Sequence, residues 1–109
     1  MTVILWPLLI ALLPQAVTLR ITPQVLLPGG SIFLEARVTP NDANRLLRLD
    51  AEPEIGVSEF SLEGSKSPTV FRRRWLVSAS GEYRITATVY DARHHILGYA
   101  HQRLVVADN

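Results

Sequence analysis

Beyond residue 17, apolar residues recur at every second position, and this period of two restricts the fold more than any other feature. The clearest stretch is 83–90, in which Tyr83, Ile85, Ala87 and Val89 alternate with Arg84, Thr86, Thr88 and Tyr90. Successive side chains of a β-strand point to opposite faces of the sheet, whereas an amphipathic helix needs a period near 3.6. The pattern therefore predicts half-buried strands along most of the chain.

Turn-forming residues separate these stretches into seven expected strands. The strands cover residues 17–22, 32–39, 47–51, 57–62, 69–77, 83–90 and 96–106. Clusters of Pro, Gly, Asn and Asp lie between them, and no stretch has the spacing of an amphipathic helix. Short strands at such intervals indicate an all-β sandwich or barrel, and seven in about 90 residues favour a sandwich.

The composition excludes several kinds of protein. The chain has no cysteine, so neither a disulfide nor a thiolate metal site stabilises it. Its net charge of +1 predicts no strong attraction to nucleic acid or to an acidic membrane. Lys66 is the only lysine among 11 basic residues. This bias reflects either genome base composition or the use of guanidinium groups to bind carboxylates and phosphates.

The N-terminal segment differs from the rest of the chain, since Arg20 is the first charged side chain. Residues 3–13 are apolar, and a proline and small residues follow them, as in a secretory signal. Cleavage after Ala16 would make 1–16 a signal peptide and 17–109 the mature domain. The alternatives are a short membrane anchor, or a segment that is neither a signal peptide nor an anchor. Residues 3–19 would form a helix of only about 26 Å, shorter than a bilayer core of about 30 Å. We expect an exported protein, located in the periplasm, on the cell surface or outside the cell.

A short motif before the clearest strand carries a family resemblance. Ser80-Gly81-Glu82-Tyr83 resembles the tyrosine corner of immunoglobulin-like sandwiches, and the strand layout of 17–107 is similar to that of bacterial immunoglobulin-like and fibronectin type III-like domains. The resemblance implies structural roles for Gly81 and Tyr83, whose hydroxyl would bond to the backbone of the turn. It implies a seven-stranded immunoglobulin-like β-sandwich. Ile85 stands where antibody-type domains have a cysteine, so a disulfide-free bacterial domain is the better match.

The candidate binding residues lie mainly in the sequence Phe71-Arg72-Arg73-Arg74-Trp75. If Phe71 and Trp75 face the core, Arg73 shares their face, which strict alternation does not allow. Either a β-bulge redirects the chain here, or Trp75 lies exposed and stacked on an arginine. In the second case Arg72, Arg73, Arg74 and Trp75 form a basic and aromatic patch. Tyr99, Tyr90 and Phe33 have the outward parity needed to extend such a patch.

Residues with catalytic or metal-binding chemistry form no recognisable set. His94, His95 and His101 suit a metal ion, but adjacent strand residues point apart, so we expect no metal site and no cofactor. No nucleophile elbow or phosphate-binding loop is present, so we do not expect an enzyme. We expect a non-enzymatic binding or assembly module of the bacterial envelope or exterior. Its partner is a protein or a carbohydrate, and not nucleic acid. The alternative functions are a carbohydrate-binding accessory module and a small periplasmic metal-binding protein.

Overall fold

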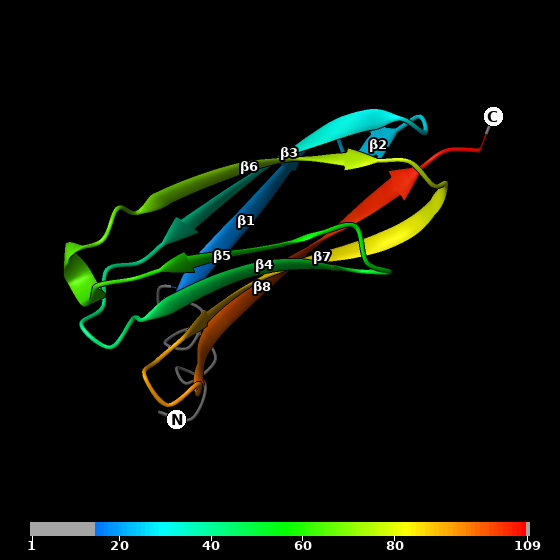
Figure 1. The fold of residues 1–109 in the computed structure, drawn as a ribbon. Coiled ribbons are helices and arrows are strands. Elements are labelled where there is room, and N and C mark those ends of the chain that lie inside the picture. The colour runs from blue at the N-terminus through cyan, green and yellow to red at the C-terminus, as the bar shows by residue number, and fades with distance from the viewer. Residues whose placement is uncertain (1–14, 109) are drawn as a thin grey trace, which may run out of the picture.

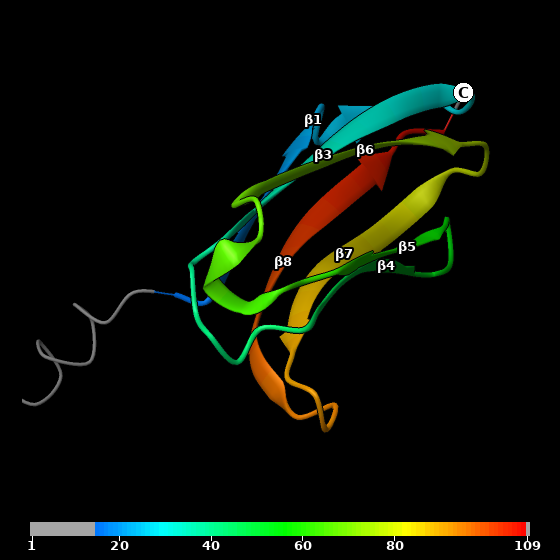
Figure 2. The same ribbon diagram turned by 60° about the vertical axis from the view of Figure 1, so that its left-hand side comes forward.

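The structure is a computed structural model and describes residues 15–108. Two β-sheets pack face to face, as Figures 1 and 2 show from two sides. Along the chain the described elements are β1 (Val17–Thr22), β2 (Val25–Leu26), β3 (Gly30–Val38), β4 (Leu46–Glu52), β5 (Val57–Ser61), the short 3-10 helix η2 (Gly64–Lys66), β6 (Val70–Val77), β7 (Gly81–Tyr90) and β8 (Ile96–Val106). One sheet has the strand order β1-β3-β6 and the other β2-β8-β7-β4-β5.

The period of two in the sequence places one side of each sheet in the core. In β1, buried and exposed residues alternate without exception. The side chains between the two sheets include Ile32, Leu47, Leu49 and Ile85, all of which are fully buried. The core is therefore mainly aliphatic, with the aromatic rings of Trp75 and Tyr83, and is built from alternate residues of both sheets, as the sequence pattern predicts for a sandwich.

The strand count differs from the expected seven, because residues 15–108 contain eight strands. The additional strand is β2, which pairs in parallel with the end of β8 through Val25↔Val105 and Leu26↔Val106. Two residues are too few to show a period, and they lie between turn-forming residues, so the sequence pattern did not reveal them. β2 is thus an edge strand of the five-stranded sheet and lies next to β8.

The turn before β7 is held by Tyr83. The hydroxyl of Tyr83 donates a hydrogen bond to the carbonyl oxygen of Ala79 at 2.7 Å, and the residue is only 7% exposed. Gly81 has a φ of +137°, a backbone conformation that residues with a side chain rarely adopt. A tyrosine hydroxyl bonded back to the backbone of the preceding turn is the arrangement that the tyrosine-corner resemblance implies.

The predicted signal or anchor of residues 1–16 lies outside the described residues except for Gln15 and Ala16. The backbone amide of Thr39 donates to the carbonyl oxygen of Ala16 at 2.9 Å, and the Thr39 hydroxyl donates to the carbonyl oxygen of Gln15. Ala16 also packs so closely on Gly98 that a Cβ atom at Gly98 would lie 2.5 Å from the Cβ of Ala16. Both residues thus contact the sandwich. No helix within residues 15–108 is long and apolar enough to cross a membrane.

Candidate binding surface on the three-stranded sheet

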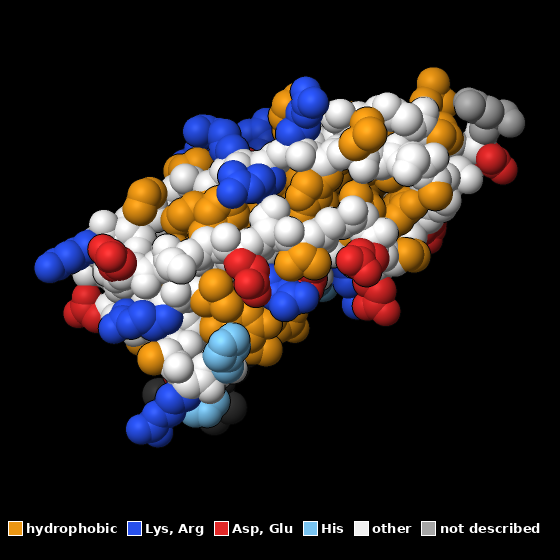
Figure 3. All heavy atoms as spheres, viewed as in Figure 1, with side chains coloured by type: hydrophobic (Ala, Val, Ile, Leu, Met, Phe, Trp, Pro, Cys, Tyr) orange, Lys and Arg blue, Asp and Glu red, His pale blue; other side chains and the backbone are white. Residues whose placement is uncertain are grey.

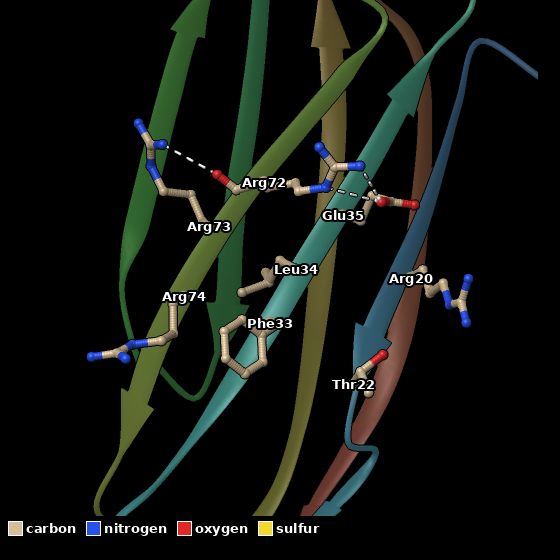
Figure 4. A pocket seen from close by; sticks show the side chains of 8 residues that line it. All are labelled: Arg20, Thr22, Phe33, Leu34, Glu35, Arg72, Arg73 and Arg74. Carbon is tan, nitrogen blue, oxygen red and sulfur yellow. Dashed lines mark hydrogen bonds and ion pairs between the residues drawn. The ribbon is translucent and has the colours of Figure 1, made fainter.

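The outer face of the sheet β1-β3-β6 collects residues from three distant parts of the chain. The strand register places Thr22, Phe33 and Arg74 in one row across the sheet, and Arg20, Glu35 and Arg72 in the next. We call Arg20, Phe33, Glu35, Arg72 and Arg74 the arginine face; these five side chains, with three neighbours, line an open hollow of about 380 Å³. Figure 4 shows Phe33 between Arg74 and Thr22. In Figure 3, basic side chains gather along the part of the surface formed by β3 and β6.

Glu35 is the acidic group of this face and joins two arginines. Its Oε2 atom accepts from Nε of Arg37 at 3.3 Å, and its Oε1 atom accepts from Arg72 at 3.2 Å. Partial desolvation raises the pKa of Glu35, but the charges and hydrogen bonds of Arg37 and Arg72 together hold this pKa below its ordinary value. The carboxylate is therefore ionised at neutral pH and occupied by these two arginines.

Arg20 and Arg74 are the basic groups of the arginine face that remain available. Within residues 15–108, neither forms an ion pair with an acidic side chain. Both are exposed and stand on opposite sides of β3, since β1 and β6 are its two neighbours. Phe33, on β3 between them, is 57% exposed. The face thus presents an uncovered aromatic ring with Arg74 directly beside it and Arg20 diagonally across from it, and neither guanidinium has an acidic partner within residues 15–108.

Neither explanation that the sequence suggested for the Phe71–Trp75 segment is correct. The pairing of β3 with β6 is regular, with no bulge, and Trp75 is 8% exposed with its indole N–H 3.4 Å from the hydroxyl of Ser58. Arg73 does share the inward parity of Trp75. It remains exposed because β6 and β5 are both edge strands, so that an inward side chain can leave between them.

Arg73 covers this open edge of the sandwich. Its guanidinium lies 4.3 Å from the centre of the Phe60 ring, and the Phe60 and Phe71 rings are 4.9 Å apart. The stem of a long basic side chain can cover apolar surface while its charge remains in water, and an arginine over an aromatic ring is favourable. In Figure 4, Arg73 points away from Glu35. Arg73 therefore covers the edge and is not directed at the arginine face.

Tyr99 lies on a different surface from Arg72 and Arg74. It is on the outer side of β8 in the five-stranded sheet, is 64% exposed, and stacks on His101 with the ring centres 6.3 Å apart. Trp75 is in the core, so these two rings do not form a common exposed platform. Tyr90, half-buried, contacts His94 with ring centres 5.4 Å apart in the β7–β8 turn. Of the aromatic residues proposed to extend the patch, Phe33 is the one that lies beside the arginines.

The histidines are divided between the β7–β8 turn and β8 itself. His94 has a φ of +61°, and Asp91 closes the turn by accepting hydrogen bonds from the backbone amides of Arg93 and His95, both at 2.8 Å. The hydrogen bond from the His95 amide is the largest cause that lowers the pKa of Asp91, and the bond from the Arg93 amide adds to it. Together they outweigh partial desolvation, which raises this pKa. In the part of the chain that the structure describes, no three His, Cys, Asp or Glu side chains are grouped so as to hold a metal ion.

Arg20 and Glu35 belong to the arginine face but were not among the residues expected from the sequence. Each has outward parity within its own strand, which is the signal that could have indicated them. Their neighbours across the sheet, however, come from strands that are not consecutive in the chain. Parity alone therefore identifies exposed residues without grouping them.

Comparison with known proteins establishes the fold alone. No family model and no curated protein matches the sequence. Among solved structures, the CARDB domain of a Pyrococcus furiosus protein, determined in complex with di-metal ions, has a TM-score of 0.64 at 21% identity, over 86% of this chain and 88% of that one. A superoxide reductase (neelaredoxin) variant from Ignicoccus hospitalis has a TM-score of 0.53 at 17% identity, over 82% and 77%. The chain therefore has a two-sheet β-sandwich fold like that of CARDB domains, which are immunoglobulin-like or cupredoxin-like sandwiches.

Proposed function

We propose that this chain is an exported, non-enzymatic β-sandwich module of the bacterial envelope or exterior, and that it binds a protein partner through the arginine face. The observation that carries the proposal is the exposed ring of Phe33 beside Arg74 and diagonal to Arg20, two arginines without an acidic partner in residues 15–108. Aromatic residues and arginine are enriched at the centres of protein interfaces.

The chemistry of the hollow favours binding over catalysis. Its carboxylate, that of Glu35, is held ionised by Arg37 and Arg72. A general base or acid works best with a pKa near the operating pH, and a lowered carboxylate pKa moves away from it. Guanidinium groups, which remain charged at all relevant pH values, bind carboxylates well and exchange protons poorly.

Site-specific crosslinking in the producing cell tests the proposal. Phe33 is replaced by a photoreactive phenylalanine analogue, and Tyr99, an exposed aromatic residue on the other sheet, is replaced in a matched control. We expect a discrete protein adduct from position 33 that is absent from position 99 and is lost when Arg20 and Arg74 are both changed to alanine. The same adducts from both positions, or adducts insensitive to the arginines, would refute the proposed surface.

Export is tested separately, because it rests on the uncharged apolar sequence before Arg20. The chain should be recovered outside the cytoplasm, and sequencing of its N-terminus should show loss of the apolar segment. Recovery of an intact N-terminus in the membrane fraction would establish an anchor instead, and recovery from the cytoplasm would refute export.

A further inference from the structure

We infer that the arginine face recognises a polypeptide segment in which two acidic side chains flank a large apolar one. This inference rests on the proposed function and specifies the chemistry of the partner. It follows from three properties of the face: the separation of its two available arginines, the apolar surface formed by Phe33 and Leu76 beside Arg74, and the position of Glu35.

The two available arginines are too far apart to bind one carboxylate easily. Arg20 lies on β1 and Arg74 on β6, and β3 separates them. Arg20 and Arg74 are two strands apart and also two residues apart along the strands, since Arg20 is opposite Glu35 and Arg74 is opposite Phe33. With strands about 4.8 Å apart and a rise of about 3.4 Å per residue, their backbones are separated by roughly 12 Å. Each guanidinium can accept one carboxylate in a bidentate arrangement. A ligand that uses both arginines therefore carries two separate acidic groups.

The surface beside Arg74 is apolar. Phe33 is 57% exposed, and Leu76, on the same outer face and two residues beyond Arg74, is 66% exposed. Ser31, the partner of Leu76 across the sheet, is two residues before Phe33, so the two apolar side chains are diagonal neighbours. A partner that covers them gains from removing apolar surface from water. Sulfated or phosphorylated polymers supply charge but no side chain for this position, whereas a polypeptide supplies both.

Glu35 works against a continuously charged partner. It lies directly between Arg20 and Arg72 in its row and carries a negative charge that Arg37 and Arg72 bind. A polyanion lying across the face brings a charge close to this carboxylate, which is unfavourable. A segment with separated acidic residues and an apolar residue between them avoids that repulsion. Glu35 is therefore a specificity-determining residue.

Selection from a random peptide library tests the inference. The full chain, kept in a mild non-ionic detergent, is immobilised and presented with 12-residue peptides displayed on phage, after depletion on the Arg20→Ala/Arg74→Ala variant. We expect enriched peptides to share two Asp or Glu residues on either side of a Leu, Ile, Phe or Trp. Binding of such a peptide should weaken at least about tenfold in Phe33→Ala, as for a central interface residue. Circular dichroism and urea unfolding check that both variants fold.

A second measurement uses dextran sulfate as a polyanion without apolar side chains. We expect the wild-type chain to bind it more weakly than the selected peptide, and Glu35→Gln to bind it several-fold more tightly than the wild type. Enriched peptides that lack the acidic and apolar combination, or none, would overturn the inference. Preferential binding of dextran sulfate to the wild type through Arg20 and Arg74 would also overturn it, but would leave the face as a binding surface. Loss of every ligand at this face would overturn both proposals.

Discussion

Replacing Tyr83 by phenylalanine removes one hydrogen bond and leaves the packing of the ring nearly unchanged. The lost bond is the one from the Tyr83 hydroxyl to the carbonyl oxygen of Ala79, at 2.7 Å. Ala79 is exposed, so water can reach its carbonyl after the substitution. The cost is therefore near the net value of an ordinary hydrogen bond, about 1 kcal/mol of unfolding free energy, and not the larger penalty of a buried unpaired group.

Replacing Tyr83 by alanine tests the packing of the same residue. The residue is buried, with 7% of its surface exposed, and it belongs to the main core cluster. Truncating a buried aromatic side chain to alanine costs about 3–5 kcal/mol, because transfer energy is lost and a cavity remains. For a domain of this size that is a large share of a total stability of roughly 5–15 kcal/mol.

Urea unfolding of the two Tyr83 variants and of Tyr90→Phe decides the question. Tyr90 is half-buried and its hydroxyl makes no hydrogen bond within residues 15–108, so its loss should change the unfolding free energy by at most about 0.5 kcal/mol. Equal, small effects of Tyr83→Phe and Tyr90→Phe would show that the hydrogen bond of the turn adds no stability. A small effect of Tyr83→Ala would contradict the assignment of the ring to the core.

Three further predictions concern other contacts. A chain starting at Val17 should be about 1 kcal/mol less stable than one starting at Gln15, because the backbone amide of Thr39 loses its acceptor; equal urea midpoints would contradict this. Folding lowers the pKa of Asp91, so the Asp91 carboxylate stabilises the folded state above its ordinary pKa of 3.8, and this stabilisation is lost as pH falls through the lower folded pKa. Urea unfolding between pH 6 and pH 2.5 should therefore show that acid reduces the unfolding free energy of Asp91→Asn less than that of the wild type. Trp75→Ala should cost about 3–5 kcal/mol in the same assay, and a near-neutral effect would show that the ring is not in the core.

Much of the strand assignment could be predicted because it depends on local geometry. In β7, alternate side chains must point to opposite faces, so the residues 83–90 that alternate in the sequence also alternate in burial over most of the strand. The tyrosine corner could be predicted for a similar reason, since the hydroxyl of Tyr83 reaches a carbonyl only four residues earlier. β2 could not, because its two residues take their strand conformation from pairing with β8.

Arg73 shows that the parity of a residue within its strand is not enough to predict whether its side chain is buried. An inward-pointing arginine would bury its charge only if β6 had neighbouring strands on both sides. β6 has β3 on one side and no strand on the other, so the guanidinium leaves the sandwich at that edge and lies over Phe60. Strand order depends on contacts between distant segments, so the sequence near Arg73 does not reveal the free edge. The same missing information made Trp75 a candidate for exposure.

The arginine face depends on strand order even more strongly, because its sheet joins the first, third and sixth strands of the chain. The net charge of +1 is a sum over the whole chain and conceals how the charges are distributed. On the outer face of this sheet, four arginines accompany Glu35 as the only acidic residue, while the acidic residues Glu52 and Glu59 lie in the other sheet. A partner meets one face at a time and responds to the local charge there. A nearly neutral total is therefore compatible with a strongly basic binding surface, provided that its arginines come from strands that only the folded sheet places side by side.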